Sequence, residues 1–254
     1  MSIDDAKLTY DGVFYDSANK YFDFELEFWN TQAKEAGKDI LELCAGTGRL
    51  TIPLAQSGFN MTGVDFTDSM LEQGLKKTME LGLNIDWVKS DIRDFNLDKQ
   101  FDMIFIPFNS MLHLQTNKDI VDTFKCVRNH LKPEGRFVID IFNPSMEILA
   151  RDPNQRFKHS RHEFFDPTKN AQVKAFESGG YDRARQIKHV QFIYIYPDGE
   201  EHLESFDLRI LYPVEIDTLL EYNGFKVVEK YGYFDMSSFV SDSPKQLIVC
   251  KKCE

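Results

Sequence analysis

Short apolar runs alternate with amphipathic segments along the first 142 residues of the chain. The apolar runs predict buried strands, and they lie at residues 40–43, 61–64, 85–88, 101–106 and 136–141. Apolar residues that recur every three or four positions predict helices at residues 19–36, 67–81 and 116–131. A further helix after Gly48 contains Pro53, so we expect it to begin late or to be distorted. The alternation predicts an α/β fold, a doubly wound and mostly parallel sheet with helices on both faces.

The pattern changes after about residue 143. Two segments alternate apolar and polar residues around a Pro-Asp-Gly turn, which predicts an antiparallel hairpin over residues 188–196 and 206–212. Shorter strands near residues 161–165 and 172–176 are expected to join this hairpin. Such a small antiparallel β cap, inserted after the fifth strand, lies over the carboxyl edge of the main sheet, where it can wall off a substrate pocket.

The last part of the chain returns to the pattern of the core. Pro213 is favourable in the first turn of a helix, which we expect to run to Tyr222. Two strands at residues 225–231 and 246–250, antiparallel to each other, bring the main sheet to seven strands. We therefore divide the chain into an N-terminal arm with a cofactor-binding core, a β cap on the substrate side, and a closing part of the core. These three parts are residues 1–149, 150–211 and 212–254.

The run over residues 39–65 carries the most specific chemistry. A Gly-Thr-Gly turn at residues 46–48 opens a helix directly after the first strand, and Asp65 ends the second strand. Glycines at such a turn let the backbone approach a nucleoside cofactor closely, and a carboxylate about 20 residues on can accept hydrogen bonds from both ribose hydroxyls. A dinucleotide fingerprint needs a third glycine three residues after the turn, where this chain has Thr51. That difference weakens a nicotinamide interpretation.

The order acidic-Leu-x-Ala-Gly-Thr-Gly at residues 42–48, followed by Gly-Val-Asp at 63–65, resembles the first two motifs of class I S-adenosylmethionine-dependent methyltransferases. Ser90-Asp91 and the stretch at 108–114 follow at matching places. With its β-rich insertion, the chain is most similar to the small-molecule branch that contains N-methyltransferases of amino-deoxysugars. The resemblance implies a Rossmann-like fold, S-adenosyl-L-methionine as methyl donor and S-adenosyl-L-homocysteine as product. The cap has no motif that assigns the acceptor, so the amine suggestion depends on analogy.

The resemblance also implies individual roles. Glu42 would hold the methionyl ammonium, usually through water, Asp65 would accept from the ribose hydroxyls, and Asp91 would accept from the adenine amino group. A tyrosine of the N-terminal arm commonly closes on the methionine end in related enzymes, and Tyr15 is the candidate here. Phe66 would flank the adenine. The full set of cofactor-binding residues that we expect is Tyr15, Glu42, Ala45, Gly46, Gly48, Asp65, Phe66, Met70, Asp91, Ile92 and Phe108.

The chemistry asked of the protein is modest. The sulfonium donor is already activated, so methyl transfer needs mainly in-line positioning and exclusion of water. An amine acceptor must also lose a proton, and a base with a pKa near neutrality helps. His113 is the only histidine in the loops that follow the core strands, which makes it our candidate general base or orienting hydrogen-bond partner. The alternative is that His113 only satisfies backbone groups.

Composition narrows the partners. The net charge of −11 and the pI of about 5.1 disfavour nucleic acid, because phosphate binding needs a basic surface. No apolar run is long enough to cross a bilayer, the first residues lack a signal peptide, and the four cysteines show no disulfide framework. We therefore expect a cytoplasmic protein without a metal site.

The sequence thus predicts methyl transfer to a small-molecule acceptor, with an amine favoured. Two alternatives stay open: an O- or protein-side-chain methyltransferase of the same fold, and a catalytically silent protein that binds S-adenosylmethionine. The oligomeric state stays open as well.

Overall fold

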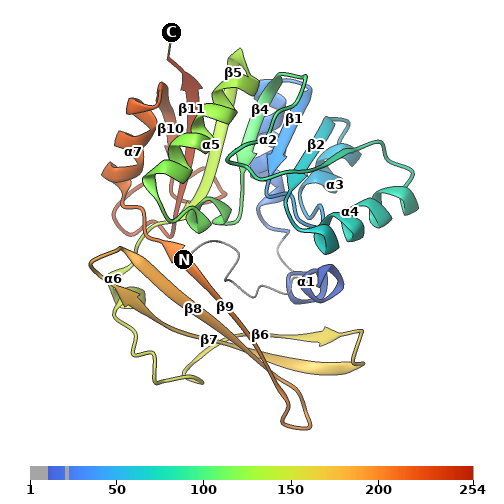
Figure 1. Ribbon diagram of the computed structural model, residues 1–254, viewed down its shortest axis with the longest axis vertical. Helices are drawn as coiled ribbons and strands as arrows, with labels where there is room; N and C mark the ends of the chain where they lie inside the picture. Colours follow the sequence, from blue (N-terminus) through green and yellow to red (C-terminus); the bar gives the residue numbers. More distant parts are fainter. Residues whose placement is uncertain (1–10, 21–22, 254) are drawn as a thin grey trace.

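The computed structural model describes residues 11–20 and 23–253, and it contains two sheets (Figure 1). The larger sheet has the strand order β10-β11-β5-β4-β1-β2-β3. Its strands are β1 (Asp39–Leu43), β2 (Asn60–Asp65), β3 (Asp86–Lys89), β4 (Phe101–Ile106), β5 (Leu131–Phe142), β10 (Phe225–Tyr231) and β11 (Lys245–Lys252). Strand β11 runs antiparallel to both of its neighbours, and the other pairs are parallel. The predicted seven-stranded, mostly parallel sheet is confirmed.

Helices cover both faces of this sheet. The helices of the core are α2 (Leu26–Ala36), α3 (Thr51–Gln56), α4 (Asp68–Glu80), α5 (Asn117–His130) and α7 (Pro213–Tyr222). Apolar side chains of α2 and α3 pack with one face of the central strands, and those of α5 and α7 pack with the other. These two buried layers supply most of the hydrophobic stabilisation of the core. Pro53 lies in the first turn of α3, so the helix begins late, one of the two outcomes expected from sequence.

The prediction of one helix over residues 19–36 is wrong. A short helix α1 (Gly12–Ala18) ends at Asn19, whose side-chain amide donates to the Tyr15 carbonyl oxygen at 2.9 Å. The next helix, α2, begins only at Leu26. Phe22, which we expected on the apolar stripe of this helix, lies outside the described residues. Helix α1 is therefore separate from α2, and it lies between the core and the cap (Figure 1).

The cap is a four-stranded antiparallel sheet of the order β6-β7-β8-β9. Its strands are β6 (His159–Asp166), β7 (Ala171–Asp182), β8 (Ile187–Ile195) and β9 (Glu201–Arg209), and helix α6 (Met146–Leu149) leads into it from β5. One face of the cap, here called the inner face, packs against α1 and against the short 3-10 helix η2 (Ser110–His113) that follows β4. The predicted sheet after the fifth strand is confirmed, while the exact boundaries at 149/150 and 211/212 stay a prediction.

In the described part of the chain, no helix is both long and apolar enough to cross a membrane. The cytoplasmic location also stays a prediction.

Candidate active site

The turn after β1 is held to the end of β2 by Asp65. Its carboxylate accepts from the backbone N–H of Gly46 at 2.8 Å and from that of Thr67 at 2.9 Å. Gly46 and Gly48 both have positive φ, 55° and 82°, which glycine adopts without strain. A Cβ on Gly48 would lie 2.8 Å from the Trp87 ring, so the turn also needs glycine for packing. The result is a compact turn beside a carboxylate that is only 7% exposed.

Glu42 lies on β1 next to this turn and is 3% exposed. It accepts a hydrogen bond from the Thr51 hydroxyl. Burial raises the pKa of Glu42 to about 8, although Thr51 and the guanidinium of Arg49 oppose that change. Because this carboxyl group is shielded from water and lies next to the glycine turn, it is suited to bind a cationic group of a ligand.

Arg49 joins several of the residues that the sequence singled out. Its guanidinium forms an ion pair with Glu25 at 2.5 Å, hydrogen-bonds the buried Tyr15 hydroxyl, and lies 4.5 Å above the Phe108 ring. Burial raises the pKa of Tyr15, so the phenol stays neutral. Sequence reasoning missed Arg49, because a single arginine after a turn has no characteristic spacing. The structure thus brings Tyr15, Glu42 and Phe108 to one place around this side chain.

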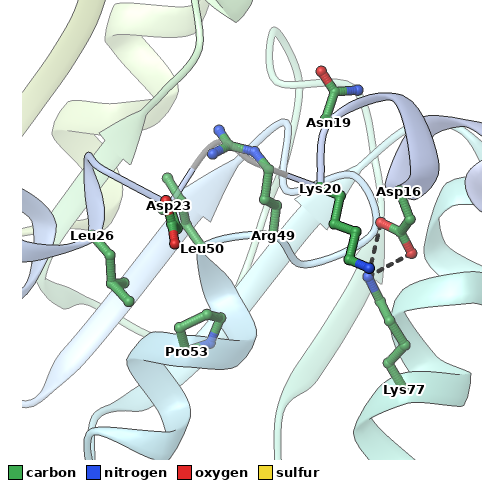
Figure 2. Close-up of a pocket in the computed structure, with 9 residues that line it drawn as sticks. All are labelled: Asp16, Asn19, Lys20, Asp23, Leu26, Arg49, Leu50, Pro53 and Lys77. Atoms are coloured by element: carbon green, nitrogen blue, oxygen red, sulfur yellow. Dashed lines mark hydrogen bonds and ion pairs between the residues drawn. The ribbon is translucent and has the colours of Figure 1, made fainter. Parts of the chain in front are cut away.

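A pocket of about 220 Å³ adjoins Arg49 on the side of α1. Figure 2 shows the side chains that line it. Its lining residues are Asp16, Asn19, Lys20, Asp23, Leu26, Arg49, Leu50, Pro53 and Lys77. Asp16 anchors α1 there, because it accepts from the Thr47 hydroxyl at 2.5 Å and from Lys77 Nζ at 2.8 Å (Figure 2 draws the Lys77 pair). Phe14 meets Tyr194 of the cap edge-on at 5.0 Å. Helix α1 therefore links the glycine turn to the cap and keeps Tyr15 beside Glu42.

The residues expected around the adenine lie in the segments that follow β2 and β3. Phe66 is 54% exposed, Met70 is buried against Gly46, and Ile92 is buried. Both oxygens of Asp91 accept from the Arg93 guanidinium, at 2.9 and 2.6 Å. Burial alone raises the pKa of Asp91, but the bonds from Arg93 outweigh it and the net pKa is lowered. An adenine amino group that binds Asp91 must therefore share its carboxylate with the guanidinium of Arg93.

The loop after β4 is positioned by a buried acid on β5. Asp140 is fully buried, accepts from the Phe108 N–H at 2.8 Å, and forms an ion pair with Lys245 at 2.7 Å. Phe108 and Asn109 have positive φ, 57° and 61°, a strained conformation that these contacts stabilise. Sequence reasoning missed Asp140, although a single carboxylate inside an otherwise apolar strand was a usable signal. Its consequence is a fixed path for the loop that carries His113.

His113 ends η2 and faces the cap. Its ring lies 5.5 Å from that of Phe206 on β9, and burial lowers its pKa to about 4. Within residues 11–20 and 23–253, no hydrogen bond to a ring nitrogen of His113 is formed. The expected pKa near neutrality is therefore wrong, because the cap removes water from the imidazole. The ring is neutral at pH 7 and can accept a hydrogen bond from a bound molecule.

Comparison with known proteins agrees with this geometry. A family model described as a methyltransferase domain matches residues 40–135. The chain is 28% identical over 232 residues to the glycine/sarcosine N-methyltransferase of Aphanothece halophytica, a match that covers 90% of this chain and 82% of that protein. The chain spans about half the length of other curated relatives that it matches, 47% and 49% in two cases.

Two solved structures share the whole fold. The CcbJ methyltransferase from Streptomyces caelestis has a TM-score of 0.76 and 24% identity, with coverage of 91% of this chain and 94% of that one. The sugar N-methyltransferase KedS8 from Streptoalloteichus sp. has a TM-score of 0.72 and 17% identity, with coverage of 95% and 92%. The sheet order and these solved structures show that this chain has the class I methyltransferase fold, and residues 40–135 of it match a methyltransferase domain. These matches agree with S-adenosyl-L-methionine as the cofactor, as the sequence implied.

Proposed function

We propose that this protein transfers the methyl group of S-adenosyl-L-methionine to an amine of a small molecule. The observation that carries the proposal is the contact of the aromatic inner face of the cap with His113, at the carboxyl end of β4. This contact brings the cap against the loop after β4, next to the cofactor residues, and a cap at that edge of the sheet favours a small acceptor over a macromolecule. The match over 90% of the chain to a protein named for N-methylation supports an amine.

The residues of the glycine turn fit the cofactor. Glu42 is a buried carboxyl that is protonated at pH 7, and a methionyl ammonium beside it would stabilise its ionised form. Asp65 keeps acceptor capacity beside its two backbone donors, and hydroxyls of a ribose would use it. Tyr15, from α1, would close over the methionine end. When bound, the cofactor supplies an electrophilic methyl group, and these side chains fix its direction.

The remaining cofactor contacts are part of the same proposal. Ala45, Gly46 and Gly48 would admit the cofactor to the turn because none of them carries a side chain larger than methyl. The adenine would lie between exposed Phe66 and buried Met70. The other expected contacts come from Asp91, Ile92 and Phe108.

His113 would orient the acceptor. A neutral imidazole accepts an N–H hydrogen bond, which leaves the amine lone pair free to point at the methyl group. A pKa of about 4 makes His113 a weak base at pH 7. We therefore assign it the role of orienting the acceptor. The dry surroundings also lower the pKa of an ammonium, and the acceptor therefore loses its proton more easily there.

A turnover assay tests this proposal. The full chain is incubated with S-adenosyl-L-methionine and a panel of small amines, alcohols, carboxylic acids and peptides, and S-adenosylhomocysteine and methylated product are measured by mass spectrometry. We expect product from amines. Product only from hydroxyls or peptides would identify the alternative transferases. Cofactor binding without product across the whole panel would identify a catalytically silent protein.

A further inference from the structure

A β-bulge in the first strand of the cap changes the direction of two side chains. Strand β6 pairs with β7, but the register shifts between Ser160 and Glu163. Arg161 and His162 lie in the shift, and both point to the inner face. His162 Nε2 lies 2.6 Å from the Ala18 carbonyl oxygen, and the guanidinium of Arg161 lies 3.9 Å above the Phe192 ring. Bulges often direct a side chain into a functional site in this way.

Arg161 forms no ion pair within the described part of the chain, although its charge acts to lower the pKa of the Glu204 carboxyl. Neither a hydrogen bond nor an ion pair joins it to residues 11–20 or 23–253, although it is half-buried. Three cap arginines do have ion pairs: Arg156 with Glu201 at 2.9 Å, Arg185 with Asp182 at 2.7 Å, and Arg209 with Glu215 at 2.7 Å. A guanidinium that is partly dehydrated and stacked on a ring has five N–H donors ready for an anion.

The inner face connects Arg161 to His113. His113 packs on Phe206 of β9, at one edge of the cap sheet, and Phe206 meets Phe192 of β8 at 5.1 Å. Arg161 comes from β6, at the opposite edge, and covers Phe192. Two phenyl rings therefore separate the imidazole from the guanidinium and form an apolar floor between them.

We propose that Arg161 binds a carboxylate of the acceptor, so that the acceptor is an aminocarboxylate whose amine lies at His113. This inference rests on the proposed function. The two intervening rings indicate an amine and a carboxylate further apart than in glycine. Each group would then be held at its own edge of the cap.

The charges around Arg161 favour a carboxylate over a phosphate. A guanidinium and a carboxylate match as a planar, two-fold hydrogen-bonded pair. Glu204, the cross-strand neighbour of Phe192, is 7% exposed and accepts from the Tyr194 hydroxyl at 3.0 Å. With one arginine and a carboxyl group so close, the inner face suits a single negative charge better than a doubly charged phosphate.

The test compares amino acids with their neutral amides at equal size. Glycine, β-alanine, 4-aminobutyrate and 5-aminopentanoate are each paired with the primary amide. Binding to the protein saturated with S-adenosylhomocysteine is measured by calorimetry, and turnover with S-adenosylmethionine is measured in parallel. We expect one of the longer acids to bind about 10- to 100-fold more tightly than its amide, the range for a hydrogen bond to a charged group. In Arg161→Gln this preference should disappear, while affinity for S-adenosylhomocysteine is unchanged.

Arg156→Gln is the matched control, because Arg156 also lies 5.3 Å from a phenyl ring but is 41% exposed and ion-paired. It should keep the preference for the acid. Equal binding of acids and amides to the wild type would overturn the inference, as would an undiminished preference in Arg161→Gln. Acid binding that depends on Arg161 without any turnover would instead contradict the proposed function and leave the carboxylate site standing. Equal turnover of the amino acids and of their neutral amides would support the proposed function and contradict the carboxylate site.

Discussion

Buried ionisable side chains give this site its chemical character at the scale of single residues. Glu42, Tyr15 and His113 all lie where burial disfavours the charged form, so all three are neutral at pH 7. Arg49 is the counter-charge between the first two, and it is fixed by Glu25. A site built from neutral groups and one fixed cation is poised to respond to a charged ligand.

Cofactor binding should release a proton from Glu42. Its pKa of about 8 means that it carries a proton at pH 7, and a ligand ammonium beside it favours the ionised form. Affinity for S-adenosylhomocysteine should therefore rise with pH up to about 8. Calorimetry at pH 7 in phosphate and in Tris should show release of up to about one proton per site. Glu42→Gln should abolish the release, and a heat that does not depend on the buffer in the wild type would contradict this assignment.

His113→Asn should lower kcat at least about tenfold if the imidazole orients the acceptor, with cofactor affinity unchanged. Since the pKa of His113 is about 4, this residue should cause no step near pH 6.5 in the pH profile of kcat/KM. The profiles of the wild type and of His113→Asn should therefore have the same shape near that pH. A step of that kind, or an unchanged kcat, would remove the orienting role.

The stability of the same variant gives a separate readout. The unfolded chain binds a proton at His113 below about pH 6.5, whereas the folded chain does so only below about pH 4. Stability of the wild type should therefore rise with pH between about 4 and 6.5, by about 3 kcal/mol from this residue over the whole window. Thermal unfolding of His113→Asn should show a flatter rise.

At the scale of elements, α1 is the piece that joins the core to the cap. Asp16 connects it to the glycine turn and to α4, and Phe14 connects it to β6 and β8. Asp16→Asn should weaken S-adenosylhomocysteine binding about tenfold, because an undocked α1 no longer holds Tyr15 over the site. Asp68→Asn, which removes the exposed pair with Lys89, is the control and should bind normally. Equal affinity in the two variants would show that α1 does not cover the cofactor.

Elements with local end signals were predictable from sequence. Helix α7 has the predicted bounds, since Pro213 begins it and Asn223-Gly224 ends it, and α5 begins after Thr116 as its capping signal indicates. β5 begins earlier than predicted, at Leu131, because Leu131 pairs with Phe101 of β4. That pairing depends on a distant strand, so no local pattern in the sequence reports it.

The site was predictable only in part for the same reason. The glycine turn and Asp65 could be found because their function imposes a spacing along the chain. Asp140 meets Lys245 across the sheet, and Arg161 reaches the inner face through a bulge, so their roles appear only after strands distant in sequence have paired. The pKa of His113 belongs to this second group, since the cap sets it from outside the local sequence.

At the scale of the whole molecule, the fold separates two binding tasks. The core holds the glycine turn, Glu42 and Asp65, whereas the aromatic inner face of the cap meets the core at His113. Phe206→Ala should therefore raise the acceptor KM about tenfold, because truncation of a large aromatic contact costs at least 1–2 kcal/mol. The Kd for S-adenosylhomocysteine should stay within about twofold of the wild type, since the ring contacts of Phe206 are with His113 and Phe192.

Phe165→Ala is the matched control for this change, because Phe165 is one strand position from inward-facing Phe164 and is 51% exposed. It removes the same side chain from the outer face of the cap and should alter neither constant. The decisive comparison in Phe206→Ala is between the change in the acceptor KM and the change in the Kd for S-adenosylhomocysteine. A KM effect without a Kd effect means that the cap selects the acceptor, since only one of the two ligands then feels the change. Parallel losses in both constants, or a large fall in melting temperature, would mean that the cap supports the core and that acceptor selection lies elsewhere.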